Sequence, residues 1–145
     1  MFVKIWSGRK VTFDSEEFLA VADALVRRND RAFCRTAAGR AYYALYWKAH
    51  DKAVGGGVDL AALQKRLGTG SHDALSWAYL TKTNRLKKPD AAARRIGASL
   101  RKLHAHRIAA DYKHTPTERI EEQAVVQLLI DDARSAIKDL GSVHW

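Results

Sequence analysis

Three histidines surround one arginine near position 107, and these two residue types can cleave RNA together without a metal ion. The histidines are His104, His106 and His114, and the arginine is Arg107. An imidazole moves a proton near neutral pH, whereas a guanidinium keeps its charge and can hold a phosphate. In a continuous helix Arg107 and His114 would share one face, about 10 Å apart along the axis. This pair is the leading candidate for chemistry.

RNA supplies its own nucleophile, the ribose 2′-OH, so a proton acceptor and a group that stabilises phosphate charge are sufficient for cleavage. His114 would move the proton and contribute about 10²–10⁴-fold in rate. Arg107 would donate charge-assisted hydrogen bonds to the phosphate as negative charge builds. The expected products carry a 2′,3′-cyclic phosphate and a 5′-hydroxyl.

Each of these residues also has a structural interpretation. Arg107 can pair with Asp111 at i,i+4, and His114 can occupy a helix C-terminus, where the helix dipole favours a cation. Asp111 is expected to orient Arg107 rather than to act as a base. Tyr112 is expected to pack, although it could stack on a base. The spacing of His104 and Asp111 does not make a convincing metal site.

Positive charge is concentrated in one stretch of the chain. The chain has a formal net charge of +9, and nine Lys and Arg residues between positions 82 and 107 face a single acid, Asp90. From position 115 onward, three basic residues face six acidic ones. A polyanion such as RNA is the natural partner of such a stretch, although a charged helix face that binds nothing is the alternative. The candidate RNA-binding residues are Lys87, Lys88, Arg94, Arg95, Arg101 and Lys102.

Length and composition favour one cytoplasmic domain. A chain of 145 residues fits one domain with a real core, here residues 1–145. The single cysteine, Cys34, excludes an internal disulfide and a Cys-rich zinc site, and its neighbours suggest that it is packed. No apolar run approaches the roughly 18 residues that span a bilayer, and the first residues lack the apolar core of a signal peptide.

Apolar residues recur at helical spacing along most of the chain, and no alternating strand pattern of useful length appears. We therefore expect an all-α, up-and-down bundle of about five to six helices, preceded by an extended segment at residues 1–12. Capping boxes are predicted at residues 14–17 and 115–118, and Ser71 is predicted to cap a helix. Breaks are expected near residues 29–30, 55–57, 68–70 and 89–90.

The middle of the second expected helix, residues 31–54, mixes small residues with four aromatic ones. Small residues let a partner helix approach closely, and tyrosine can bury its ring while its hydroxyl makes a hydrogen bond. Packing within one core is one interpretation. The other is a face shared across a homodimer, for which the candidates are Arg40, Tyr42 and Tyr43.

Four segments of the chain together resemble the HEPN-domain family. The segment RTAAGRAYYALYWKAH is similar to that family's long second helix, and GSHDALSWAY is similar to the stretch after its central loop. The segment LRKLHAHRIAADYKH looks like its signature helix, where an Arg precedes Ala-Asp-Tyr, and EEQAVVQLLIDDARSAI looks like the following helix. The resemblance covers roughly residues 14–140 and implies the HEPN type of helical bundle.

The resemblance implies a site made of an Arg, four to six intervening residues and a His. Arg107 and His114 meet that pattern, and Arg101 with His106 meets it loosely, but the Ala-Asp-Tyr triplet favours Arg107. It also implies a cytoplasmic homodimer that cleaves tRNA or mRNA without metal or cofactor, as the toxin of a toxin–antitoxin or defence system. An antitoxin such as a nucleotidyltransferase would be its partner.

Two positions depart from the family pattern. Ile108 stands where a polar residue usually follows the Arg, and this favours the alternative of a non-catalytic module that binds RNA, a nucleotide or an enzyme partner. Pro116 stands where one subgroup carries a Tyr that receives AMP, so that modification is excluded at this position. A third alternative is a basic surface that binds an acidic protein partner.

Overall fold

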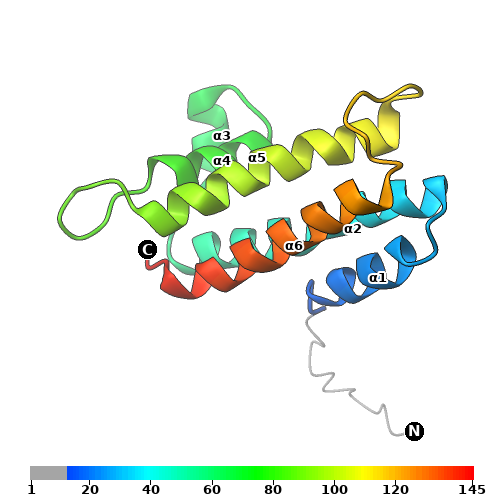
Figure 1. Ribbon diagram of the computed structural model, residues 1–145. Coiled ribbons are helices and arrows are strands. Elements are labelled where there is room, and N and C mark those ends of the chain that lie inside the picture. The colour runs from blue at the N-terminus through cyan, green and yellow to red at the C-terminus, as the bar shows by residue number, and fades with distance from the viewer. Residues whose placement is uncertain (1–12) are drawn as a thin grey trace, which may run out of the picture.

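The computed structural model describes residues 13–145, and that part of the chain is almost entirely helical (Figure 1). Its elements in order are α1 (Glu17–Val26), α2 (Arg31–Gly55), α3 (Leu60–Leu67), α4 (Ser71–Thr81), α5 (Ala91–Tyr112), α6 (Gln123–Asp139) and the short 3-10 helix η1 (Leu140–Ser142). Extended pairing within residues 13–145 is limited to one isolated bridge between Thr83 and Pro89. The predicted all-α bundle of five to six helices is confirmed, and the predicted extended segment at residues 1–12 lies outside the described residues.

Helices α1, α2, α5 and α6 run alternately up and down, and the chain inserts two further helices between α2 and α5. Figure 1 shows α1, α2, α5 and α6 in this alternating order, with α3 and α4 inserted between α2 and α5. Helix α2 lies at the centre and packs against α1, α5 and α6, while α4 packs against α5. The residues that could do chemistry on α5 therefore face both α2 and α4.

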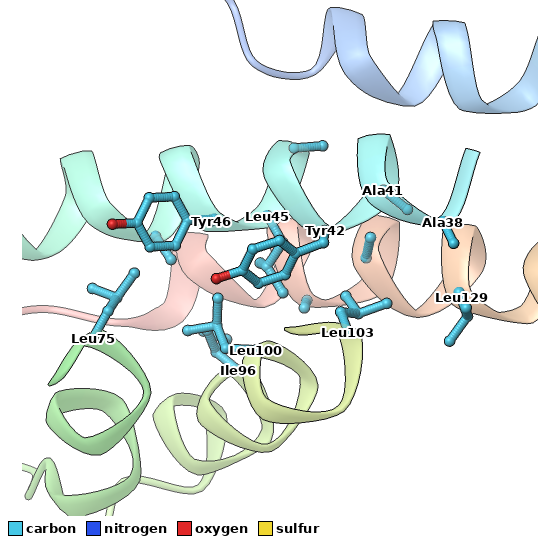
Figure 2. Close-up of a cluster of buried hydrophobic side chains, with 14 of the residues drawn as sticks. Ala38, Ala41, Tyr42, Leu45, Tyr46, Leu75, Ile96, Leu100, Leu103 and Leu129 are labelled. Carbon is cyan, nitrogen blue, oxygen red and sulfur yellow. The ribbon is translucent and has the colours of Figure 1, made fainter. Parts of the chain in front are cut away.

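Small side chains let α2 occupy the centre of the bundle. Six of its alanines are at most 1 % exposed, namely Ala37, Ala38, Ala41, Ala44, Ala49 and Ala53. Between them, Tyr42 and Leu45 reach toward Leu100 and Leu103 of α5 (Figure 2). Each fully buried leucine contributes roughly 1.5–3 kcal/mol relative to an exposed one. The predicted packing of Cys34 is also seen, since its side chain is fully buried.

Three aspartates fix where helices begin. The side chains of Asp30, Asp59 and Asp90 each accept a hydrogen bond from a backbone N–H in the first turn of α2, α3 and α5. Such a bond satisfies an N–H that has no partner within the helix. At the other end of α3, Gly68 adopts a left-handed conformation with φ of 63°, which glycine tolerates without strain.

Of the three predicted caps, the one at residues 14–17 forms in part and the other two are wrong. Before α1, which begins at Glu17, the Asp14 side chain accepts a hydrogen bond from the Glu16 backbone N–H at 3.0 Å, but the reciprocal bond of a capping box is absent from residues 14–17, and the Ser15 hydroxyl donates to the carbonyl of Ala44 across the core. Helix α4 begins at Ser71 itself, after Gly70. Helix α6 begins only at Gln123 rather than after residues 115–118, because Arg119 has φ of 58° and interrupts any helical path.

Candidate active site on helix α5

Arg107 lies near the C-terminal end of α5 and is held on several sides. Its Nε lies 2.9 Å from Oδ2 of Asp111, although the angle is too poor for a hydrogen bond. The guanidinium carbon lies 5.2 Å from the ring centre of Tyr43 and 5.5 Å from that of Tyr112. The whole side chain is 16 % exposed. The guanidinium is thus fixed in position by an acid and two aromatic faces.

The backbone of α2 comes close to this ion pair because Gly39 has no side chain. A Cβ atom built on Gly39 would lie 3.9 Å from Oδ1 of Asp111 and 4.0 Å from Cγ of Arg107. These are ordinary van der Waals distances, so alanine would fit there but a larger side chain would press on the pair. The predicted role of Asp111 in orienting Arg107 agrees with this geometry, and Tyr112, 73 % exposed, covers one side of the guanidinium.

The prediction that one continuous helix carries both Arg107 and His114 is wrong. Helix α5 ends at Tyr112, and Lys113 adopts an extended conformation with φ of −89° and ψ of 123°. His114 therefore lies exposed at the start of the loop that leads to α6. Its distance from Arg107 is not set by helical geometry.

Arg35 of α2 explains why the helix stops where it does. Its Nε donates to the carbonyl of Ala110 at 2.8 Å, and one Nη donates to the carbonyls of Ala109 and Lys113. The other Nη donates to Glu121 at 3.0 Å. A cation at this end also complements the helix dipole. The peptide before His114 is therefore fixed by Arg35, a role that no local pattern in the sequence indicated.

Two further histidines, which the sequence did not single out as a pair, meet between α4 and α5. The rings of His72 and His104 stack with their centres 4.6 Å apart and their planes 15° apart. The hydroxyl of Tyr42 is hydrogen-bonded to Nδ1 of His72, and Tyr46 lies 4.7 Å from the His72 ring. His104 precedes Arg107 by three residues on α5, so the two side chains are neighbours on the helix surface.

Burial is the main influence on both of these imidazoles. It lowers the pKa of His72, a proton on His104 and the charge of Arg107 lower that pKa further, and Asp73 opposes them. Burial also lowers the pKa of His104, where Asp73 opposes the shift and Arg107 adds to it. Both rings are therefore neutral at pH 7. Burial raises the pKa of Tyr42, so its hydroxyl stays protonated.

The six predicted RNA-binding residues fall into two groups. Arg95 and Lys102 face α6, where they pair with Asp139 at 3.0 Å and Asp132 at 3.5 Å. The other four are exposed and make no ion pair within residues 13–145; they are Lys87, Lys88, Arg94 and Arg101. Lys87 and Lys88 lie in the loop before α5, and Arg94 and Arg101 lie two turns apart on it. These four are free to contact phosphates.

The three predicted dimer-interface residues differ in accessibility. Arg40 is exposed, with its guanidinium carbon 5.2 Å from the centre of the Phe18 ring. Tyr43 is half-buried beside Arg107. Tyr42 is 1 % exposed within the single chain, so its side chain has no surface to offer a partner. Packing within the core is therefore the correct interpretation for Tyr42.

Neither a metal site nor a membrane span is found in the part of the chain that the structure describes. Within residues 13–145 no three His, Cys, Asp or Glu side chains are arranged to hold a metal ion. No helix in that range is long and apolar enough to cross a membrane. Comparisons with family models, with curated proteins and with solved structures find no match for this chain.

Proposed function

We propose that the protein is a metal-independent endoribonuclease of the HEPN type that cleaves RNA through its 2′-OH. The observation that carries the proposal is the state of the Arg107 guanidinium. Its Nε faces Asp111, while its two Nη nitrogens make no hydrogen bond within residues 13–145 and are not sealed from solvent. A fixed guanidinium with free Nη atoms can donate two parallel hydrogen bonds to phosphate oxygens.

Charge stabilisation is the contribution of Arg107 to the reaction. As the 2′ oxygen attacks, negative charge grows on the phosphate oxygens, and a donor that is already in place stabilises it without reorganising. His114, in the loop anchored by Arg35, is the predicted group for proton transfer. The exposed cations before and along α5 would hold the RNA backbone on either side of the cleaved bond.

A homodimer that acts as a toxin is part of the proposal. Two copies related by a twofold axis would bring two Arg107 sites to one cleft, with the exposed Arg40 and the half-buried Tyr43 at or near the shared face. The protein would act in the cytoplasm on tRNA or mRNA. An antitoxin, such as a nucleotidyltransferase, would restrain it.

Cleavage of total RNA or tRNA in excess EDTA tests the proposal. Wild-type protein is expected to cut, and Arg107→Ala is expected to lose about 10³-fold in rate, the upper end for removal of one charge-stabilising donor. Arg134→Ala is the matched control, because that exposed arginine of α6 pairs with Asp23 away from Arg107. Equal, background-level cleavage by all three proteins would overturn the proposal.

A non-catalytic RNA-binding module is the second candidate, and two observations favour it. Arg107 is only 16 % exposed and paired with Asp111, as a purely structural arginine would be. Ile108 beside it is 37 % exposed and apolar. This candidate predicts that wild-type protein binds RNA in a gel-shift assay and never cuts it. Tight binding to an acidic protein with none to RNA would favour the third alternative, a protein-docking surface.

A further inference from the structure

The stacked imidazoles of His72 and His104 have no part in the reaction described so far. They lie where α2, α4 and α5 meet, and their rings are 4.6 Å apart. The ring of Tyr42 is 5.2 Å from that of His104 and 5.6 Å from that of His72. Three helices thus converge on two polar rings that an ordinary apolar core would not contain.

The two rings are held differently. His72 has its Nδ1 bonded to the hydroxyl of Tyr42. Neither ring nitrogen of His104 makes a hydrogen bond within residues 13–145, and neither is sealed from solvent. His104 also lines an open hollow of about 700 Å³ together with Asp73, Arg101 and Ile108. A ligand in this hollow can therefore reach His104, while His72 stays fixed behind it.

Groups from all three packed helices surround His104, and the charged ones lie on α4 and α5. Helix α4 contributes Asp73, and α5 contributes Arg101 and Arg107. Helix α2 contributes the phenol of Tyr42, whose pKa burial raises, so that it is neutral at pH 7. Burial of the ring lowers the pKa of His104, Asp73 opposes this shift and Arg107 adds to it, so the imidazole is unprotonated at neutral pH. A neutral imidazole accepts a proton.

We infer that His104 is a second catalytic histidine of this site, the general base that takes the proton from the RNA 2′-OH, and that His72 and Tyr42 position its ring. The inference rests on the proposed ribonuclease function and deepens it. His104 lies three residues before Arg107, so a phosphate bound by the free Nη atoms would lie next to the imidazole. Base and charge stabiliser would then act on one nucleotide.

The reaction would proceed as a single displacement at phosphorus. The 2′-OH proton moves to a ring nitrogen of His104 while the 2′ oxygen forms a bond to phosphorus. The bond from phosphorus to the 5′ oxygen breaks, and that oxygen takes a proton from His114 or from water. The products are a 2′,3′-cyclic phosphate and a 5′-hydroxyl, and His104 then returns its proton to solvent.

Cleavage rates between pH 5 and 8 in excess EDTA test the role of His104. The variant His104→Phe keeps an aromatic ring in the stack but cannot accept a proton. It is expected to lose about 10²–10⁴-fold in rate, together with the rise in rate that the wild type shows as the base deprotonates. His106→Phe is the matched control, because that histidine lies on another face of α5 with Nδ1 against the Lys102 carbonyl. It should keep both the rate and the pH profile.

The positioning role has its own readout, which does not depend on cleavage. In NMR titrations the His104 ring signal should change with a midpoint below 6.5, and His72→Phe should shift this midpoint whereas His106→Phe should not. An unchanged His104 midpoint would show that His72 does not position the His104 ring. Circular dichroism and a second variant, His104→Gln, show whether any loss of activity reflects unfolding.

The outcomes distinguish the ribonuclease function from the role of His104 as its general base. If the wild type cuts, Arg107→Ala does not, and His104→Phe cuts at the wild-type rate with the wild-type pH profile, the inference is overturned and the proposed function stands. If the wild type does not cut any RNA, both fall. Loss of cleavage in folded His104→Phe and His104→Gln, with normal cleavage by His106→Phe, supports the inference.

Discussion

His104 and His114 lie on opposite sides of Arg107 in the chain, and their surroundings differ. His104 lies on helix α5, half-buried, with its ring stacked on that of His72 from another helix. His114 sits in a loop, exposed, and only the peptide before it is fixed, by Arg35. Groups on packed helices hold a catalytic geometry better than groups on loops. The comparison suggests that spacing from an arginine identifies a candidate, whereas packing decides whether it is held in place.

The largest expected effect is on the rate of RNA cleavage when His104 and His114 are each replaced in a separate variant. We expect His104→Phe to slow RNA cleavage by about 10²–10⁴-fold, the range of a general base. His114→Ala should cost less, because an exposed acid can be replaced in part by water. Single-turnover rates in EDTA measure both losses, and a greater loss for His114→Ala would reverse the comparison.

Removing Arg35 should loosen the His114 region and leave the His104 region intact. Arg35→Ala removes the donor for three carbonyls and leaves Glu121 unpaired, which we expect to lower the free energy of unfolding by about 1–3 kcal/mol. Urea denaturation measures this change. Hydrogen exchange should rise at residues 113–122 but not around His104. Equal protection in both proteins would show that Arg35 does not fix the loop.

Acid should destabilise the protein through the His72 and His104 region. Both pKa values are lowered in the folded state, so the unfolded chain, with its ordinary values near 6.5, binds protons first as the pH falls. The free energy of unfolding should therefore decrease as the pH drops from 7 to 5. The slope is at most about 1.4 kcal/mol per pH unit for each histidine. Urea midpoints at each pH test this, and the double variant His72→Phe/His104→Phe should show a flatter profile.

The smallest expected effect is on the salt dependence of RNA binding, and it compares the two faces of α5. Arg94 and Arg101 are exposed and unpaired within residues 13–145, whereas Arg95 and Lys102 are paired with α6. Each phosphate contact adds about 0.7 to the slope of log affinity against log salt for a single strand. Arg101→Ala should lower that slope by about this amount, and Lys102→Ala should lower it less. Equal changes would show that the ion pairs with α6 open when RNA binds.

Much of the fold could be predicted from the sequence, because helical periodicity and the aspartate caps are local properties. The regions of all six helices and the break at residues 55–57 follow from such patterns. The start of α6 could not be predicted, because it depends on the backbone of Arg119 and on distant contacts of Arg35. The capping motif at residues 115–118 therefore does not start a helix, and α6 begins at Gln123.

The candidate site was predictable only where its residues are neighbours in sequence. The pairing of Arg107 with Asp111 follows from i,i+4 spacing on a helix. The stacking of His72 on His104 does not, because it depends on how α4 packs against α5. That packing is close, since a Cβ on Gly97 would lie 2.6 Å from Cγ of Leu80. Tertiary contacts of this kind cannot be predicted from the spacing of residues in the sequence.

Metal-free cleavage through the 2′-OH can be measured on a matched pair of oligonucleotides in excess EDTA. One is an RNA that the protein cuts, and the other carries a single 2′-deoxy nucleotide on the 5′ side of the cleaved bond. We expect the RNA to be cut to a 2′,3′-cyclic phosphate and the deoxy-substituted strand to stay intact at that position. Cleavage of both strands, or cleavage only after a divalent metal is added, would contradict this expectation.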